Sequence, residues 1–201
     1  MKSLLLIAAL ALIATPALAE QTYTNGFEDC CFLCTYLDLD VECVTSPVHS
    51  GTYAAHLTDQ TASGTPYLVV AWVTGLVHGD QVHAEFWTYD TTPGGSPSNR
   101  IWGHYTGIGE TDPCDYAGSA GGNSAYGDGT GWSLLSYDFT YDNTAGDRGG
   151  LSIEARSYSV PGDETWVDDV LVTVPDYATV VFCPPNPVDD STWGKVKALY
   201  R

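Results

Sequence analysis

Three stretches of the chain alternate small or apolar side chains with large polar or aromatic ones: Gln81–Tyr89, Arg100–Tyr105 and Leu151–Tyr158. Successive side chains of a β-strand point to opposite faces, so this period of two predicts strands that bury one face. The other face is rich in Trp, Tyr, Arg, Glu and His, which is unusual for a surface that meets only water. The working hypothesis is that this face contacts a ligand.

The rest of the chain between Glu20 and Phe182 contains further strand-like runs and no amphipathic helical stretch. The continuous apolar run Tyr67–Val73 is typical of a strand central to a sheet. Other strands are predicted at Gln21–Asn25, Tyr53–Leu57, Trp132–Tyr141, Thr165–Val174 and Tyr177–Phe182. Many short strands without helices indicate an all-β sandwich.

Two long segments between the strands are predicted to be loops. The cysteine-rich segment Asp29–Cys43 is interpreted as a loop stapled by its own disulfide bonds. The segment Gly107–Gly131 is crowded with Gly, Asp, Asn and Ser and lacks hydrophobic periodicity, so we expect a surface loop held by Cys114. Loops of this length in compact domains are often functional.

The two ends of the chain differ in character from its middle. Residues 1–19 combine a basic start, a short apolar run and a small-x-small ending, which predicts a signal peptide cleaved after Ala19. We therefore expect a secreted protein, extracellular or at the cell surface, with a β-sandwich domain over residues 20–182. Residues 183–201 form a Pro-rich linker and a short C-terminal appendage, either a frayed tail or a segment that docks on an envelope or export partner.

The formal net charge of −18 bears on the choice of partners. So acidic a chain argues against nucleic acid and anionic membranes. It is compatible with divalent cations, neutral polysaccharide or a saline habitat, and equally with an acidity that only keeps a secreted protein soluble. No apolar segment of membrane length follows the signal peptide, so no membrane span is expected in the mature chain.

An even number of cysteines in an exported chain predicts disulfide bonds. The six are Cys30, Cys31, Cys34, Cys43, Cys114 and Cys183. A bond from the Cys30/Cys31 pair to Cys183 would tie the two ends of the domain together, although six cysteines permit about 15 pairings. A zinc site at Cys31 and Cys34 is the alternative, but no second metal-binding pair accompanies them.

Five short motifs occur in an order that matches a known family. They are Asn25–Glu28 (NGFE), Ser50–Leu57 (SGTYAAHL), Val73–Trp87, Gly131–Trp132 with Phe139–Thr140, and Trp166–Val170 (WVDDV). Together they resemble the galactose-binding-like jelly-roll domains, which include carbohydrate-binding modules of secreted bacterial proteins. The resemblance covers residues 21 to 174 and implies a jelly-roll β-sandwich of two antiparallel sheets.

The resemblance implies a structural calcium ion between the first strand, the Ser-Gly turn and the last strand. Its ligands would be Glu28, backbone carbonyls around Ser50 and Gly51, and a carboxylate of Asp168 or Asp169. Calcium takes six to eight oxygen ligands, which such residues supply. Asp168 shares a strand face with apolar residues, where a carboxylate is costly unless a cation or hydrogen-bond donors meet it. The alternative is a solvated acidic strand end.

The resemblance also implies that the polar face binds a polysaccharide. Aromatic planes stack on the CH faces of sugar rings, while polar groups pair with their hydroxyls. The alternative is that the aromatics pack under loops and that the charges pair across strands. The candidate ligand-binding residues are Trp87, Tyr89, Trp102, Tyr158, Arg100, Arg156, Glu85, Glu154, His83 and His104.

No recognised catalytic motif occurs in the chain, so binding is favoured over catalysis. The predicted function is that of a secreted, non-catalytic carbohydrate-binding protein. A structural or adhesive surface protein is the first alternative. A secreted polysaccharide hydrolase or lyase is the second, with Glu85 and Glu154 as the paired carboxylates such an enzyme needs.

Overall fold

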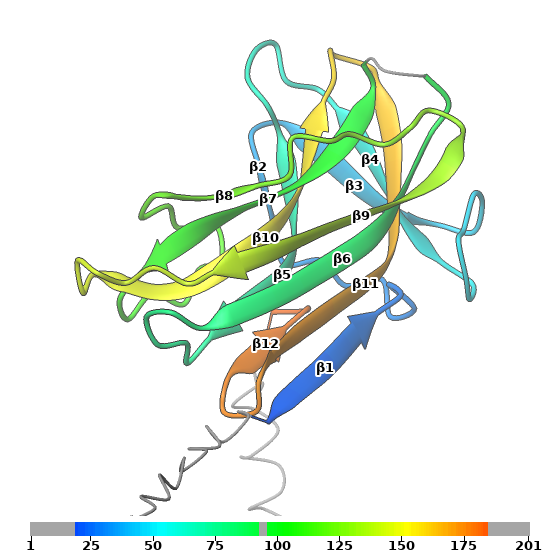
Figure 1. The fold of residues 1–201 in the computed structure, drawn as a ribbon. Helices are drawn as coiled ribbons and strands as arrows, with labels where there is room; N and C mark the ends of the chain where they lie inside the picture. Colours follow the sequence, from blue (N-terminus) through cyan, green and yellow to red (C-terminus); the bar gives the residue numbers. More distant parts are fainter. Residues whose placement is uncertain (1–18, 93–95, 185–201) are drawn as a thin grey trace, which may run out of the picture.

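The computed structural model describes residues 19–92 and 96–184, and the predicted signal peptide and C-terminal appendage lie almost wholly outside these ranges. The described residues form twelve strands and no helix. The strands make two antiparallel six-stranded sheets that enclose one hydrophobic core (Figure 1). The predicted all-β sandwich of two antiparallel sheets is therefore confirmed. None of the described residues belongs to a helix able to cross a membrane.

The first sheet is called the β6 sheet here. Five of its strands follow one another in the order β3 (Leu39–Val44), β4 (Ala54–Asp59), β11 (Glu164–Pro175), β6 (Gln81–Asp90) and β9 (Gly131–Thr140). The sixth, β1 (Glu20–Asn25), pairs with the later half of β11, beyond the part that pairs with β4.

The second sheet is called the β10 sheet. Its main order is β12 (Thr179–Val181), β5 (Tyr67–Thr74), β10 (Arg148–Tyr158), β7 (Ser98–Gly107) and β8 (Ser119–Gly122). The short strand β2 (Cys34–Tyr36) pairs with the start of β5. The three alternating stretches of the sequence thus fall in two different sheets, with β6 in one and β7 and β10 in the other.

The core forms from the apolar half of each alternating stretch. Val82, Ala84 and Phe86 of β6 are fully buried, and so are Leu151 and Ile153 of β10. The alternation therefore predicted correctly which positions face inward, because a period of two leaves one side of a strand for the core.

Two predicted loops contain short strands. Asp29–Cys43 includes β2 and most of β3, and Gly107–Gly131 includes β8. Strands β2 and β8 have three and four residues and carry no alternating pattern of their own. They exist because neighbouring strands offer unpaired backbone groups, which is information that lies elsewhere in the chain. Strand β3 does alternate, with Leu39, Val41 and Cys43 on one side and Asp40 and Glu42 on the other, so the prediction of a loop there overlooked a local signal.

All six cysteines are paired, as Cys30–Cys43, Cys31–Cys183 and Cys34–Cys114. The first bond staples the cysteine-rich segment to itself, as expected. The second joins the Cys30/Cys31 pair to Cys183, which confirms the predicted tie between the two ends of the domain. Because both thiols of the Cys31/Cys34 pair are in disulfides, the zinc alternative is wrong.

Candidate functional site

The ten candidate ligand-binding residues do not share one face. His83, Glu85, Trp87 and Tyr89 lie on β6, whereas the other six lie on β7 and β10 of the opposite sheet. Each set alternates with core residues, so the two sets point out of opposite sides of the sandwich. The prediction of a single polar face is therefore wrong. The candidates form two separate surfaces, called here the β6 surface and the β10 surface after the sheets that carry them.

On the β6 surface, the aromatic rings pack largely on one another. The ring of His49 stacks on Trp87 with centroids 3.9 Å apart. Tyr89 meets the edges of Trp132 and Trp166, which are both half-buried. A hollow of about 360 Å³ beside Trp87 is lined by only one aromatic ring, with Glu85 and Asp169 among its other lining residues.

At the edge of the same surface, His83 lies between two carboxylates. Its Nδ1 is 2.7 Å from Asp138 and its Nε2 is 3.4 Å from Glu85. Partial burial lowers the pKa of His83, but hydrogen bonds to Asp138 and Glu85 more than offset this and raise it above its usual value. The side chains of His83 and Tyr89 are therefore both in contact with neighbouring side chains of the protein.

On the β10 surface, strand register sets the side chains in rows. Arg156 stands directly opposite Tyr67 of β5 on one side and Arg100 of β7 on the other. Glu154 stands opposite Trp102 in the next row. Nε of Arg156 donates to Oε2 of Glu154 at 2.7 Å, and Nη2 lies 2.7 Å from the same oxygen. This ion pair fixes the direction of Arg156.

Glu154 and His104 are fully buried, so neither contacts a ligand directly and their predicted role is wrong. They lie beneath residues 112–117 of the segment that follows β7. Oε1 of Glu154 is 2.6 Å from Nδ1 of His104, and Nε2 of His104 donates to the carbonyl of Pro113 at 3.0 Å. Instead, His104 anchors residues 112–117 to the sheet, and Glu154 orients Arg156.

The β10 surface is hollowed into a pocket of about 290 Å³. Its lining residues are Tyr36, Thr65, Tyr67, Tyr116 and Arg156. The rings of Tyr36 and Tyr67 stack at 5.0 Å, and Tyr116 is 60% exposed. Burial, with the nearby charge of Glu154, raises the pKa of the Tyr67 hydroxyl above its usual value, so it stays a neutral donor. Of the ten candidates, only Arg156 lines this pocket.

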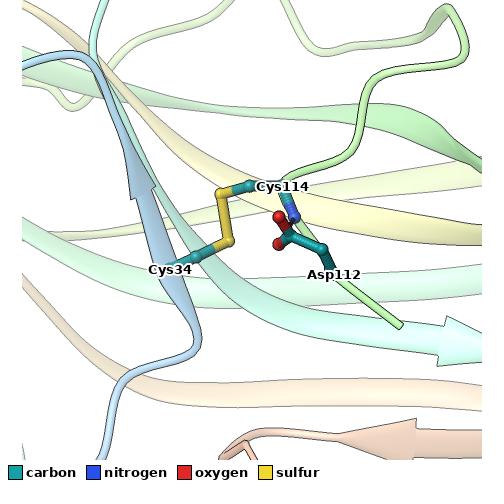
Figure 2. Close-up of side chains that lie close together, drawn as sticks. All are labelled: Cys34, Asp112 and Cys114. Atoms are coloured by element: carbon teal, nitrogen blue, oxygen red, sulfur yellow. Dashed lines mark hydrogen bonds between the residues drawn. A yellow bond between two sulfur atoms is a disulfide. The ribbon is translucent and has the colours of Figure 1, made fainter. Parts of the chain in front are cut away.

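The three tyrosines were missed because none lies on the alternating stretches. Tyr36 and Tyr116 each follow a cysteine by two residues, and those cysteines, Cys34 and Cys114, are bonded to each other (Figure 2). The disulfide therefore joins two walls of the pocket. The spacing was visible in the sequence, but it carries meaning only once the pairing is known.

Asp112 also lies beside this disulfide (Figure 2). Its Oδ1 accepts a hydrogen bond of 2.8 Å from the backbone N–H of Cys114, which closes a local turn. Both sulfurs are already bonded to each other, so Asp112 and the two cysteines do not offer the thiolate ligands that a metal ion requires.

The five candidate calcium-binding residues do come together, although they are far apart in the sequence. Oγ of Ser50 donates to Oδ1 of Asp169 at 2.7 Å. The backbone N–H of Thr52 donates to Oε1 of Glu28 at 2.7 Å. Gly51, at a φ of 65°, leaves the space that Glu28 fills, since a Cβ there would lie 2.1 Å from Oε1 of Glu28.

Three acidic side chains of this cluster border Gly26. A Cβ on Gly26 would lie 3.5 Å from Asp169, 3.9 Å from Asp168 and 4.0 Å from Cγ of Glu28. Asp168 is fully buried, as predicted, and accepts backbone N–H groups from His49, Ser50 and Asp169. Burial raises the pKa of Asp168, which these bonds oppose. Donors therefore satisfy Asp168, and the hard oxygens around Gly26 are of the type that calcium prefers.

The arrangement does not provide a pair of catalytic carboxylates. Glu85 lies on the outer side of the β6 sheet, and Glu154 is buried beneath a loop on the other sheet. A glycosidase pair must flank one bond of the substrate at roughly 5 to 10 Å. Two carboxylates on opposite sides of a sandwich do not meet that requirement.

Comparison with solved structures places the fold among carbohydrate-binding modules. The CBM22-1 xylan-binding domain from Paenibacillus barcinonensis Xyn10C matches with a TM-score of 0.53 and 15% identity, over 79% of this chain and 97% of that one. The C-terminal family 22 carbohydrate-binding module of Clostridium thermocellum Xyn10B matches with a TM-score of 0.53 and 10% identity, over 77% and 94%.

A third match includes an enzyme. The CBM22-1–GH10 modules of Clostridium thermocellum Xyn10B, complexed with xylohexaose, align with a TM-score of 0.52 and 13% identity. The match covers 75% of this chain and 28% of that one, so this chain corresponds to little more than a quarter of it. No protein-family model and no curated protein matches the sequence.

These likenesses define a class of fold. The chain is a jelly-roll β-sandwich of the kind found in carbohydrate-binding modules, as the motif resemblance implied. At 10 to 19% identity they show the fold alone. The fold does not identify the ligand, which depends on the residues of this chain's own surface.

Proposed function

We propose that this protein binds carbohydrate in the pocket of the β10 surface. The observation that carries the proposal is the lining of that pocket, with three tyrosines and an arginine around a hollow of about 290 Å³. Tyrosine rings offer planes for the CH faces of a sugar and hydroxyls for its polar groups. Arg156, already fixed by Glu154, pairs with ring or hydroxyl oxygens at little cost in side-chain entropy.

The β10 pocket is favoured over the hollow beside Trp87 because of its aromatic content. Three tyrosines line the first, and one tryptophan with a histidine on it lines the second. Trp102 and Tyr158 extend the aromatic surface of the β10 sheet beyond the pocket, and Tyr158 is largely exposed. A chain of several sugar rings has room to lie along that surface.

The proposal is tested by titrating the protein with oligosaccharides of a glycan panel and following heat release. Tyr116→Ala should weaken binding at least ~10-fold, since a stacked aromatic contributes about 1 kcal/mol or more. Leu134→Ala, an exposed change on the opposite sheet, should leave affinity unchanged. If Trp87→Ala abolishes binding while Tyr116→Ala does not, the β6 surface is the site and the proposal is wrong.

We also propose that the protein is not an enzyme on its own. The placement of Glu85 and Glu154 on opposite sheets, with Glu154 buried, supports this. Incubation with polysaccharides should release no new reducing or unsaturated ends. Turnover that Glu154→Gln abolishes would establish the hydrolase or lyase alternative. Self-association of the protein without binding to any glycan would instead favour the structural or adhesive alternative.

We propose that the protein works outside the cytoplasm. The three disulfides support this, because such bonds persist in oxidising compartments. Residues 1–18, which hold almost all of the predicted signal peptide, lie outside the described ranges. N-terminal sequencing of protein recovered from the medium should begin at Glu20, and retention of the full chain inside the cell would contradict secretion.

We further propose that Glu28, Asp168 and Asp169, with backbone groups of Ser50 and Gly51, hold a structural calcium ion. The proximity of these three acidic side chains supports the proposal, with oxygens of Asp168 and Asp169 near Gly26 and the carboxylate of Glu28 against Gly51. Calcium at about 100 times its dissociation constant should stabilise the fold by about 2.7 kcal/mol. The measurement is thermal unfolding in calcium and in excess chelator at equal ionic strength.

Two variants sharpen the calcium test. Asp169→Asn should remove the calcium-dependent gain in melting temperature. Asp138→Asn removes a carboxylate elsewhere on the same sheet and should leave the gain intact. Equal melting temperatures of the unmodified protein with calcium and with chelator would refute the calcium site.

A further inference from the structure

On the basis of the proposed carbohydrate binding, we propose that the ligand is an acidic polysaccharide whose anionic groups pair with Arg100 and Arg156. The overall charge of −18 favours neutral glycans, since like charges repel. The charge at the proposed binding site is opposite in sign to the net charge of the whole chain. The proposal rests on where the few basic side chains lie.

Basic side chains are scarce in the part of the chain that the structure describes. Apart from histidines, residues 19–92 and 96–184 contain Arg100, Arg148 and Arg156 alone, against 23 acidic residues in the same ranges. Two of these three flank one indole ring. The guanidinium carbons of Arg100 and Arg156 lie 4.5 Å and 5.2 Å from the ring centroid of Trp102.

The two arginines are also direct partners in strand register, Arg156 on β10 facing Arg100 on β7. Like charges directly opposite in an antiparallel pair destabilise a sheet. Cation–π contact with Trp102 offsets part of this cost. An anion bound between the two guanidinium groups would remove the repulsion and add charge-assisted hydrogen bonds.

Arg100 has its charge available for a ligand. Among the described residues, Arg156 pairs with Glu154 and Arg148 with Asp142, whereas no carboxylate lies within ion-pair distance of Arg100. Its other close neighbour is Tyr126, whose ring centroid is 5.5 Å away. A half-exposed arginine between two aromatic rings is a suitable contact for an acidic sugar.

The carboxylate of Glu154 is shared between Arg156 and His104. Its Oε2 accepts a hydrogen bond from Nε of Arg156, and its Oε1 lies 2.6 Å from Nδ1 of His104. Both oxygens of this buried carboxylate are therefore engaged.

The patch formed by Arg100, Trp102 and Arg156 therefore places two guanidinium groups at the rim of the tyrosine pocket. Arg156 belongs to both, since it also lines the pocket. The acidic remainder of the protein is screened beyond about 8 Å at physiological ionic strength. A glycan with carboxylate or sulfate groups fits this patch better than an uncharged one.

The test compares glycans that differ only in charge. Galacturonan oligosaccharides and their methyl esters share a backbone, and a sulfated galactan with its desulfated form makes a second pair that separates sulfate from carboxylate. Calorimetric titration should give at least ~10-fold tighter binding of the charged member, as expected for one charge-assisted contact. Arg100→Gln should remove most of that preference.

Arg148→Gln is the matched control. It makes the same change in net charge at the opposite end of β10, so it should preserve the preference. Equal affinity for both members of each pair would overturn the inference while leaving carbohydrate binding intact. Failure of every charged and neutral glycan to bind would overturn both proposals.

Discussion

Glu85 and Glu154 show how far the environment of a residue decides its role. Both were expected to contact a ligand, and both lie on the outer side of a strand. Glu85 is half-buried beside His83, whereas Glu154 is sealed beneath a loop and binds Arg156 and His104. A buried carboxylate with two charge-assisted contacts positions its neighbours and has no oxygen left for a sugar.

His83 leads to a prediction about pH. Its pKa is raised in the folded protein, so its contribution to stability is fully present below the pKa of the unfolded chain, about 6.5, and is lost as pH rises through the folded pKa. The stability difference between the unmodified protein and His83→Gln should therefore be larger at pH 5.5 than at pH 8.5. Urea unfolding at the two pH values measures it.

Asp138 is the partner that makes this prediction specific. In an Asp138→Asn background, the effect of His83→Gln should differ less between the two pH values, because the 2.7 Å hydrogen bond to Asp138 is gone and only the longer contact with Glu85 remains. A His83→Gln effect that is the same at pH 5.5 and pH 8.5 in the unmodified background would show that the carboxylates do not hold a proton on His83.

At the scale of elements, the tyrosine pocket depends on two pieces of chain with little regular structure. Strand β2 carries Tyr36 and has three residues, and residues 112–117 carry Tyr116 and lie over β7 and β10. Neither piece buries enough apolar area to hold itself in place. The Cys34–Cys114 bond joins them, and the contact of Pro113 with His104 fastens the second to the sheet.

Removing this disulfide should weaken both glycan binding and the stability of the fold. Replacing Cys34 and Cys114 by serine should weaken glycan binding at least ~10-fold, because the walls of the pocket lose their connection. Stability should fall by about 2–4 kcal/mol, the usual range for one disulfide. The two measurements are calorimetric titration and urea unfolding. Unchanged affinity in the double variant would show that the pocket does not depend on the bond.

At the scale of the whole molecule, the two sheets approach closely enough to exclude a side chain at Gly103. This residue lies on β7 between Ile101 and Tyr105, where the alternation places a core side chain. A Cβ there would lie 2.8 Å from Cε1 of Phe139 on the other sheet and 3.1 Å from the carbonyl oxygen of Ser152. Phe139 fills the space that Gly103 leaves.

Gly103→Ala should therefore destabilise the sandwich by about 1–3 kcal/mol, as overpacking of a dense core does. In combination with Phe139→Leu, which shortens the opposing side chain, the two changes should cost less together than the sum of their separate effects. Urea unfolding of the four proteins in this cycle measures the coupling. Strict additivity would show that the two residues do not compete for the same space.

From the sequence alone, we could predict the fold class, the inward face of each long strand, and the residues of the acidic cluster around Gly26. The inward faces were predictable because strand alternation is local, since every second residue must face the core. The acidic cluster was predictable because short motifs resemble those of a known family. The C-terminal appendage, residues 183–201, remains a prediction, because the described part of the chain ends at Pro184.

Only the tertiary structure decided which surface holds the pocket. Strands β6, β7 and β10 have the same alternation, but alternation does not state which sheet a strand joins, and pairing placed β6 opposite the other two. Cysteine pairing is equally non-local, so Tyr36 and Tyr116 could not be connected from the sequence. The candidate site changed from one polar sheet face to a tyrosine pocket because long-range pairing, unlike side-chain period, leaves no mark on neighbouring residues.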